Sequence, residues 1–336
     1  MLDLTIAICA YNAAARLPAA LEAIGAMDIP SDISWECLLI DNASTDETER
    51  VADDVGRRLG LRLRIVREAE QGLVFARRRA AIEARGEMVI FVDDDTWVRK
   101  DYAANGVRFL REHPKAGMVG GRIMAKFEEP ASEPAGFNEH YAAALAIRDC
   151  GPMTRKLEGP DEDPPHGGGM VIRTAILRQV IVEIGCYCVG RKGSALSTGE
   201  DTEIGLICRK LGWETWYAPE LEIWHVLPPR RLSREYLDDL IIAGAAANTW
   251  LDYLRGREPR RGRVGYYCLH VLWMWLATRM AWVKLIKGTK HRDAGRFPFW
   301  IRMYRSRADG YLELARTNPA ANLEAAIKKV SAGRSI

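Results

Sequence analysis

The chain has 336 residues, of which 48 are Lys or Arg and 45 are Asp or Glu, for a formal net charge of +3. Hydrophobic residues make up 48% and charged residues 28%, a composition that excludes a disordered or low-complexity protein. The charge is too balanced to indicate nucleic-acid binding. The sequence also lacks the G-x-x-x-x-G-K-[ST] motif of P-loop enzymes and the G-x-G-x-x-G motif of dinucleotide-binding domains.

The seven cysteines are odd in number and none is spaced as C-x-x-C, which argues against a secreted disulfide framework. We expect the cysteines to be small buried hydrophobic residues. The alternative is an incidental metal or redox site at the close pair Cys186 and Cys188. No basic segment precedes the short apolar run at the N-terminus, so this run predicts a strand and not a signal peptide. The sequence therefore predicts a cytoplasmic protein.

Short apolar runs alternate with helical patterns through the first hundred residues. The predicted strands are 4–10, 35–40, 63–66 and 88–92, and the predicted helices are 13–26, a charged segment ending near 59, and 72–85 with Gly86 as its stop. This alternation predicts an α/β fold with a mostly parallel sheet covered by helices on both faces.

The next hundred residues have a less regular pattern. Residues 127–165 predict a loop around a short helix, and Gly167-Gly168-Gly169 leads into a strand at 170–172 and a further helix. A helix is expected over 200–211, followed by two short strands at 213–218 and 221–225. After residue 230 the composition changes, and Ser233 is expected to cap a long helix that ends near Arg255.

Polar residues follow three of the predicted strands, at Tyr11-Asn12, Asp41-Asn42 and Asp93-Asp94-Asp95. The carboxyl ends of parallel strands form the edge where ligands bind in such sheets. Three adjacent carboxylates suit a hard divalent cation shared with a diphosphate, with Asp93 and Asp95 facing one pocket and Asp94 another. The alternative is an Asp-rich turn before the next helix.

Two further motifs have both a functional and a purely structural interpretation. Glu200-Asp201 opens a predicted helix, so it either complements the helix dipole or supplies a general base near the Gly167–Gly169 turn. His225 ends a predicted strand, where it is either a hydrogen-bonded structural residue or a ligand for a metal or phosphate. Arg230 and Arg231 follow it and could bind a diphosphate.

Taken in order, these motifs resemble those of family 2 glycosyltransferases with the GT-A fold, over about residues 3–230. The matching residues are Ile8-Cys9-Ala10-Tyr11-Asn12, Leu39-Ile40-Asp41-Asn42-Ala43-Ser44-Thr45-Asp46, Gly72-Leu73 with Ala76-Arg77, Ala84-Arg85-Gly86-Glu87, Phe91-Val92-Asp93-Asp94-Asp95, Gly168-Gly169-Met170, Gly199-Glu200-Asp201-Thr202-Glu203 and His225. Each motif is weak alone, whereas the ordered set is specific.

The resemblance implies a metal-dependent, inverting transfer of one sugar from a nucleotide-diphospho-sugar, most commonly a UDP-sugar, to an acceptor hydroxyl. By the same resemblance, Ala10, Tyr11, Asn12, Asp41, Asn42, Gly72, Arg77, Asp93 and Asp94 would bind the donor, and Asp93, Asp95 and His225 would hold Mg²⁺ or Mn²⁺. Asp201 would be the general base with Glu200 beside it, and Gly168, Gly169 and Met170 would border the acceptor. The acceptor would be a saccharide or a lipid-linked molecule of polysaccharide or glycolipid assembly.

The sequence departs from the family pattern in places. Cys9-Ala10 replaces a common Pro-Thr, and the Asp triplet leaves open which two carboxylates act. The Gln-x-x-Arg-Trp motif of polymerising relatives is absent, which favours transfer of a single sugar. The alternative functions are a nucleotidyltransferase-like enzyme and a non-catalytic nucleotide-sugar-binding protein at a membrane.

We expect residues 1–230 to form the catalytic domain, with a nucleotide-sugar half at 1–125 and an acceptor half at 126–230. Residues 231–336 predict a helical, basic and aromatic region. Its apolar segment 264–286 contains His270, Arg279 and Lys284, so contact with the inner face of the cell membrane fits better than a span. The alternative is a helical hairpin on the catalytic domain or on a partner. Oligomeric state is left open.

Overall fold

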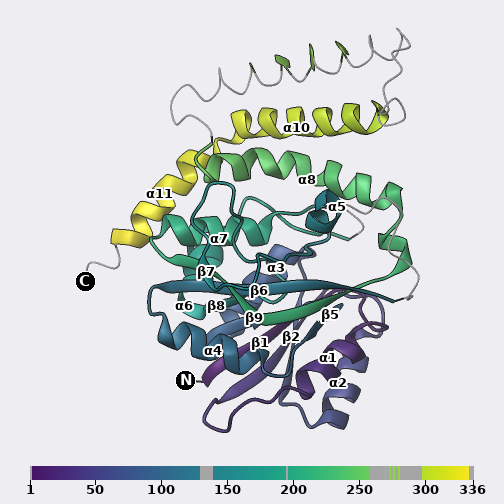
Figure 1. Cartoon of the computed structure of the whole chain (residues 1–336), viewed down its shortest axis with the longest axis vertical. Helices are drawn as coiled ribbons and strands as arrows, with labels where there is room; N and C mark the ends of the chain where they lie inside the picture. Colours follow the sequence, from purple (N-terminus) through teal and green to yellow (C-terminus); the bar gives the residue numbers. More distant parts are fainter. Residues whose placement is uncertain are drawn as a thin grey trace.

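The computed structural model describes residues 2–128, 139–193, 196–257, 269, 272–273, 275–276, 279–280 and 297–332. One sheet runs through the fold in the order β3-β2-β1-β4-β8-β6-β9-β5, with β7 paired to β9 (Figure 1). Its strands are β1 (Leu2–Ala10), β2 (Trp35–Asn42), β3 (Leu63–Glu68), β4 (Gly86–Phe91), β5 (Thr96–Val98), β6 (Ala116–Phe127), β7 (Arg155–Lys156), β8 (Val171–Arg173) and β9 (Glu214–Leu227).

Helices cover both faces of this sheet. They are α1 (Leu17–Gly25), α2 (Thr48–Leu59), α3 (Leu73–Glu83), α4 (Tyr102–Glu112), α5 (Glu139–Ala144), α6 (Thr174–Arg178), α7 (Glu200–Lys210), α8 (Arg234–Leu254), α10 (Phe297–Thr317) and α11 (Pro319–Ala332), with a π-helix η1 (Gln179–Ile184) and a 3₁₀ turn η2 (Pro229–Arg231). Successive side chains of a strand point to opposite faces. In β1, Ile6 and Ile8 therefore join a core with α1, α2 and α4, while Ala7 joins a core with α3, α6, α7 and α8.

The first half of the sheet is parallel, as the alternating pattern predicts. Strands β3, β2, β1 and β4 pair in parallel, and Ala10 lies opposite Asp41 where β1 and β2 end. Because these strands end at the same edge, the polar residues after them come together. Gly86 was expected to stop α3, but this helix ends at Glu83 with Ala84 as its C-cap, and Gly86 is the first residue of β4. Only a glycine fits at this position, because a Cβ would lie 2.4 Å from the backbone of Leu4.

The second half of the sheet is mixed. Strand β8 is antiparallel to β4 and β6, β6 is parallel to β9, and β5 and β7 are antiparallel to β9. The two short strands expected at 213–218 and 221–225 are a single strand, β9. The interruption is a bulge, because Tyr217 pairs with Gly120 and Glu222 already pairs with Arg122.

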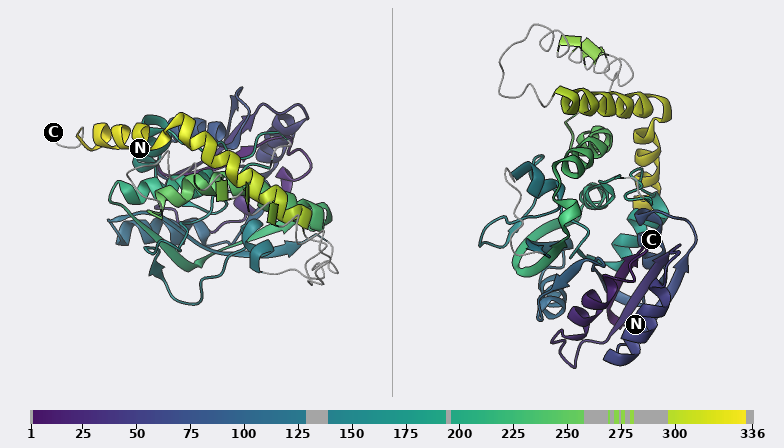
Figure 2. Two further views of the ribbon diagram at one scale, coloured as in Figure 1. Left: turned by 90° about the horizontal axis from the view of Figure 1, so that it is seen from above. Right: turned by 90° about the vertical axis from the view of Figure 1, so that its right-hand side faces the viewer.

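The C-terminal region begins with α8, where the Ser233 hydroxyl accepts a hydrogen bond from the Tyr236 N–H as expected of a cap. Helix α10 runs alongside α8 on the side away from the sheet, and α11 packs against η1 (Figures 1 and 2). Most of the predicted segment 264–286 lies outside the described residues. Within the described part of the chain, no helix is both long and apolar enough to cross a membrane.

Six cysteines lie in the described ranges, and each carries a thiol and not a disulfide. Cys37, Cys188 and Cys208 are buried, whereas Cys9, Cys150 and Cys186 are partly exposed. Burial raises the pKa of the Cys186 and Cys188 thiols well above the usual value. Both side chains are therefore neutral thiols at neutral pH.

Candidate active site

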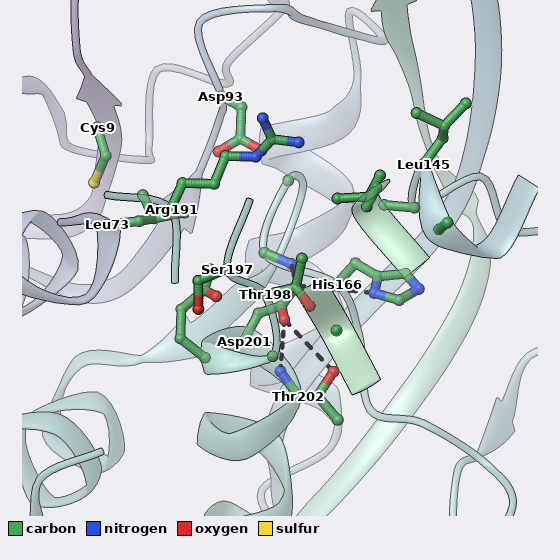
Figure 3. A pocket seen from close by; sticks show the side chains of 18 of the residues that line it. Cys9, Leu73, Asp93, Leu145, His166, Arg191, Ser197, Thr198, Asp201 and Thr202 are labelled. Atoms are coloured by element: carbon green, nitrogen blue, oxygen red, sulfur yellow. Dashed lines mark hydrogen bonds and ion pairs between the residues drawn. The ribbon is translucent and has the colours of Figure 1, made fainter. Parts of the chain in front are cut away.

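A cavity of about 700 Å³ lies at the carboxyl ends of β1 and β4, between the sheet and helices α7 and α8. Figure 3 shows its interior, with Cys9 and Asp93 on one side and Leu145 and His166 on the other. Nine of the proposed donor and metal residues line it, namely Ala10, Tyr11, Asn12, Asn42, Arg77, Asp93, Asp94, Asp95 and His225, and so do Gly168, Glu200 and Asp201. The fold thus assembles polar residues from segments far apart in the sequence.

The loops after β1 and β2 are tied together at the cavity. Asn12 has a left-handed backbone (φ 46°), which places its Oδ1 2.8 Å from the Thr45 N–H. The Asn12 N–H in turn donates to the Ser44 hydroxyl at 3.0 Å. Asn42 donates to the Glu70 carbonyl and accepts from the Gly72 N–H, which fixes the start of α3. These contacts join the loops after β1 and β2 to the start of α3.

Four of the proposed residues lie behind the cavity wall. Asp41 is buried, accepts the Ser44 N–H and pairs with Arg67 at 3.1 Å, and Gly72 caps α3 with a φ of 144°. Met170 is in the hydrophobic core, and the Gly169 carbonyl accepts the Tyr102 hydroxyl. None of the four is among the residues that line the cavity.

The three carboxylates after β4 face the same cavity, whereas the sequence predicted that Asp94 points elsewhere. The alternation of a strand does not apply to them because the chain leaves β4 at Phe91 and turns at Asp94 and Asp95. Asp94 pairs with Arg16, with 2.7 Å between Oδ2 and Nη2. Asp93 lies against Gly168, where a Cβ would come 2.8 Å from its Oδ2. Burial raises the pKa of both Asp93 and Asp94.

Asp95 and His225 share one cation, Arg231. The Arg231 Nη1 lies 2.7 Å from Asp95 Oδ2 and donates to His225 Nε2 at 3.0 Å. His225 donates from Nδ1 to the Leu145 carbonyl at 2.8 Å, so Nε2 carries the lone pair. Burial would raise the pKa of Asp95, but the positive charge of Arg231 holds it well below its usual range.

These donors suit a divalent cation in type but form an incomplete set. Carboxylate oxygens and a neutral imidazole nitrogen are ligands of Mg²⁺ and Mn²⁺. Among the described residues, however, no three His, Cys, Asp or Glu side chains form a ready metal cluster. The Oδ2 atom of Asp95 and the Nε2 atom of His225 lie 3.6 Å apart. A cation bound by these two residues would need further ligands, such as diphosphate oxygens. The site fits a metal that binds together with a nucleotide.

The two acidic residues at the start of α7 have different surroundings. Glu200 is buried and its Oε1 lies 2.8 Å from Nη1 of Arg77, itself only 2% exposed. Asp201 lines the cavity, and its two oxygens accept the Gly167 and Thr202 N–H groups at 2.8 and 2.7 Å. Because Arg77 already holds Glu200, Asp201 is the carboxylate available to a substrate.

Sequence reasoning missed several residues of the cavity. His166 lies beside Asp201, Arg16 holds Asp94, and Arg191, Ser197 and Thr198 form part of the wall near α7 (Figure 3). Their positions depend on tertiary contacts, and no spacing in the sequence marks them. Apolar residues from the end of α5, the residue after it and α8 also line the cavity, namely Ala143, Ala144, Leu145, Leu240, Ile241 and Leu251.

Comparison with protein families gives one match that spans most of the described sheet. Residues 3–240 match the family described as glycosyltransferase like family 2. A solved structure of GalNAc-T7 with UDP, GalNAc and Mn²⁺ aligns with a TM-score of 0.50 and 17% identity, over 72% of this chain and 47% of that one. The structural likeness supports the α/β fold class of the GT-A type, as expected.

Curated relatives match over shorter segments. A PGL/p-HBAD biosynthesis glycosyltransferase of Mycobacterium tuberculosis (strain ATCC 25177 / H37Ra) is 33% identical over 123 residues, which are 36% of this chain and 47% of the relative. The poly(ribitol-phosphate) beta-N-acetylglucosaminyltransferase TarS of Staphylococcus aureus (strain MW2) is 26% identical over 154 residues, or 44% of this chain and 27% of TarS. The chain thus spans about half the length of the first relative and about a quarter of the second.

Proposed function

Because the chain belongs to the glycosyltransferase like family 2, we propose that it transfers one sugar from a nucleotide-diphospho-sugar to an acceptor hydroxyl, with inversion. One observation carries this proposal. A single cavity holds both the carboxylate cluster after β4, which suits a metal-bound diphosphate, and Asp201 on α7, which suits the reacting hydroxyl.

The donor would lie along the β1 and β4 side of the cavity. Ala10, Tyr11, Asn12 and Asn42 line this side, while Asp41 and Gly72 brace its loops from behind. A UDP-sugar is the donor we favour, since TarS is named an N-acetylglucosaminyltransferase and the GalNAc-T7 structure contains UDP. Arg77 and Asp93 would shape this side through buried contacts.

Asp95, Asp93 and the Nε2 of His225 would hold a divalent cation, Mg²⁺ or Mn²⁺, together with the donor diphosphate. When bound, such a cation offsets the negative charge that builds up on the leaving diphosphate. Arg231 lies 2.7 Å from Asp95 and would add a second positive charge at that position, with Arg230 next to it on η2.

Asp201 would act as the general base, and the proton of the acceptor hydroxyl would move to its carboxylate. As the hydroxyl oxygen bonds to the anomeric carbon, the bond from this carbon to the diphosphate breaks and the nucleoside diphosphate leaves with the electron pair. Glu200 stays buried against Arg77 and would position the start of α7. Gly168 would border the acceptor, since it lies in the wall between Asp93 and Asp201.

The apolar wall formed by α5 and α8 supports an acceptor with an apolar portion, such as a lipid-linked saccharide of polysaccharide or glycolipid assembly. The hydroxyl groups of a donor sugar do not account for the three leucines of this wall, namely Leu145, Leu240 and Leu251. Polar acceptor hydroxyls would reach Asp201 from this side of the cavity.

We also propose that the protein binds peripherally to the inner face of the cell membrane. The described positions between 269 and 280 expose six large apolar side chains: Leu269, Leu272, Trp273, Trp275, Leu276 and Met280. Arg279 lies over the Trp275 ring at 4.1 Å, and the sequence continues with Lys284, Lys287 and Lys290. Aromatic and basic residues together suit an anionic lipid surface.

Vesicle sedimentation tests this membrane proposal. We expect binding to phosphatidylcholine vesicles that contain phosphatidylserine, and loss of binding in the double variant Leu272→Glu, Leu276→Glu. Leu312→Glu on α10 is a matched control because Leu312 is similarly exposed, at 51%. Equal binding of all three proteins would contradict the proposal.

The transferase proposal is tested by thermal unfolding with a panel of nucleoside diphosphates and their sugars, with and without Mn²⁺. A ligand that binds only the folded state raises the midpoint. We expect a metal-dependent rise with one nucleotide, lost in Asp95→Ala, and turnover that Asp201→Asn abolishes. Release of pyrophosphate in place of nucleoside diphosphate would indicate a nucleotidyltransferase. Nucleotide binding without turnover would indicate a non-catalytic binding protein.

A further inference from the structure

Arg191 is a half-buried cavity residue whose guanidinium lacks a carboxylate partner. Six arginines line the cavity, and four of them form ion pairs, namely Arg16, Arg77, Arg231 and Arg255. The other two are Arg230, which is exposed, and Arg191, and neither pairs with a carboxylate among the residues that the structure describes. A charge that is partly withdrawn from water is costly without a counter-ion. Arg191 therefore suits an anionic ligand in the cavity.

The main chain of Arg191 is attached to the donor side of the cavity. Its carbonyl accepts the Leu73 N–H at 2.9 Å, and the Val189 carbonyl accepts the Val74 N–H at 3.2 Å. Both N–H groups belong to the first turn of α3, where a helix has no internal acceptors for them. Figure 3 shows the Arg191 side chain extending from there into the cavity, toward Asp93.

A hydroxyl group on α8 positions the end of this side chain. The Arg191 Nη2 donates to the Tyr236 hydroxyl at 3.0 Å. Tyr236 is in the first turn of α8, which directly follows η2 and its Arg231. Burial would lower the pKa of Arg231, but Asp95 and then Tyr236 raise it above its usual value, so Tyr236 lies near both arginines. Arg191 and Arg231 thus reach the same part of the cavity, where Arg231 pairs with Asp95.

We propose that Arg191 binds the diphosphate of the donor and that Tyr236 positions its guanidinium. This inference rests on the proposed transferase function and adds two residues to the donor site that the sequence did not indicate. A guanidinium has five N–H donors in one plane, so Arg191 can bind two phosphate oxygens while one N–H stays on Tyr236.

The donor is the better source of this anion for two reasons. The Arg191 carbonyl is fixed at the start of α3, next to the loops after β1 and β2. The guanidinium shares Tyr236 with Arg231, whose partner Asp95 is one of the proposed metal ligands. A phosphate carried by the acceptor is the other source of the same chemistry, and the experiment below distinguishes the two.

The proposed role adds no proton transfer to the reaction. The acceptor oxygen bonds to the anomeric carbon, and its proton moves to Asp201. The bond from that carbon to the diphosphate oxygen breaks, and the electron pair stays on this oxygen. Arg191 keeps all its protons and donates hydrogen bonds to the phosphate oxygens on which negative charge builds up. Such bonds strengthen as the charge develops, so they lower the barrier as well as bind the donor.

Calorimetric titration with UDP, UMP and inorganic pyrophosphate, each with Mn²⁺, tests the inference. UMP lacks the second phosphate and pyrophosphate lacks the nucleoside, so the comparison isolates the diphosphate whatever base the donor carries. We expect Arg191→Gln to weaken the binding of UDP and pyrophosphate about 10-fold and that of UMP less than about 2-fold, since charge-assisted hydrogen bonds are lost. Arg62→Gln is the matched control, because Arg62 is exposed and does not line the cavity.

Tyr236→Phe tests the positioning role, because it removes only the hydroxyl. We expect this variant to weaken UDP binding about 3-fold in the wild-type background and to have no further effect in Arg191→Gln. An equal effect in both backgrounds would show that Tyr236 does not act through Arg191. Arg191→Lys keeps the charge but loses the planar fork, so it should recover only part of the affinity. In turnover, Arg191→Gln should lower kcat about 100-fold.

Two results would overturn the assignment of Arg191 and leave the transferase proposal intact. One is wild-type affinity of Arg191→Gln for UDP and pyrophosphate, and with a raised KM for the acceptor it would assign Arg191 to an anionic acceptor group. The other is an equal loss for UDP and UMP, which would mean that Arg191 only orders the cavity. Conversely, Arg191-dependent binding of pyrophosphate in a wild type that consumes no donor would support the phosphate site while the transferase proposal fails.

Discussion

Arg77 of α3 and Glu200 of α7 form a buried ion pair, with 2.8 Å between Nη1 and Oε1, although 123 residues separate them in the sequence. The pair joins the parallel half of the fold to the start of α7, where Asp201 follows. The Arg77 guanidinium also lies 5.6 Å from the centre of the Phe91 ring. It thereby couples the end of β4, which leads into the Asp triplet, to the proposed base.

Arg77→Met should destabilise the protein strongly, because it leaves the Glu200 charge buried without a partner. Removing one partner of a buried pair costs roughly 3–5 kcal/mol in free energy of unfolding. The double variant Arg77→Met, Glu200→Gln should recover much of that loss, since no charge is left unpaired. Urea unfolding of the wild type and the three variants measures both effects. A loss below about 1 kcal/mol in Arg77→Met would show that Glu200 takes up a proton or is reached by water or another cation, since burial already raises the pKa of Glu200 to about 7.

The sequence predicted the parallel half of the fold well because local patterns determine it. Polar residues directly follow the apolar strands 4–10 and 35–40. Parallel pairing brings the carboxyl ends of these strands to one edge of the sheet. The sequence also predicted that Arg77 binds the donor; Arg77 lines the cavity, and the sequence did not indicate its buried ion pair with Glu200. That contact depends on how α3 and α7 pack across the sheet, which no local spacing encodes.

The mixed half was harder to predict for a different reason. The bulge in β9 and the turn at Asp94 and Asp95 are backbone features that break the alternation on which strand predictions depend. His166 was missed because its position in the cavity is beside Asp201, a residue 35 positions later in the sequence. A lone histidine before a glycine run has no pattern that predicts such a partner.

Gly167→Ala should disturb the site by steric overlap. A Cβ at this position would lie 1.9 Å from Nη2 and 2.6 Å from Cζ of Arg77. Since Arg77 is held by Glu200, the clash moves the turn that binds Asp201, and we expect a loss of roughly 1–3 kcal/mol in stability. Gly25→Ala is the control, because its nearest neighbour would be 3.5 Å away. Equal unfolding midpoints for the two variants would contradict this prediction.

We expect Arg231 to compete with a bound metal for Asp95 and His225. Its Nη1 lies 2.7 Å from Asp95 Oδ2 and 3.0 Å from His225 Nε2, which are the two atoms we propose as ligands. Arg231→Gln should therefore tighten Mn²⁺ binding in the absence of nucleotide, by roughly 3–10-fold, because a nearby positive charge is removed. Isothermal titration calorimetry measures the change. Arg230→Gln is the control, since Arg230 lines the cavity without pairing to Asp95.

Weaker Mn²⁺ binding in Arg231→Gln would mean that the arginine orders Asp95 for the metal instead of competing with it. The wild type should then also need Arg231 for the nucleotide-induced rise in the unfolding midpoint. Asp95→Ala is a control for both cases, because it removes the shared carboxylate and should abolish metal binding with or without Arg231.

Asp201 should contribute stability that is lost in acid. Its pKa in the folded protein lies well below the usual value, so the unfolded chain takes up the proton first as the pH falls. The contribution is therefore fully present above the unfolded pKa of about 3.9 and disappears as the pH falls toward the folded pKa. Asp201→Asn should cost roughly 1–3 kcal/mol at pH 7, since an amide offers one acceptor oxygen to two N–H donors.

The difference in free energy of unfolding between wild type and Asp201→Asn should stay level from neutral pH to about pH 5 and shrink toward about pH 3. Urea unfolding at four pH values across this range measures it. Asp53→Asn at the exposed ion pair on α2 is the control and should change stability by no more than about 0.5 kcal/mol at neutral pH. A difference that grows as the pH falls would mean that the Asp201 carboxylate destabilises the fold. The contacts with Gly167 and Thr202 would then serve the reaction at the expense of stability.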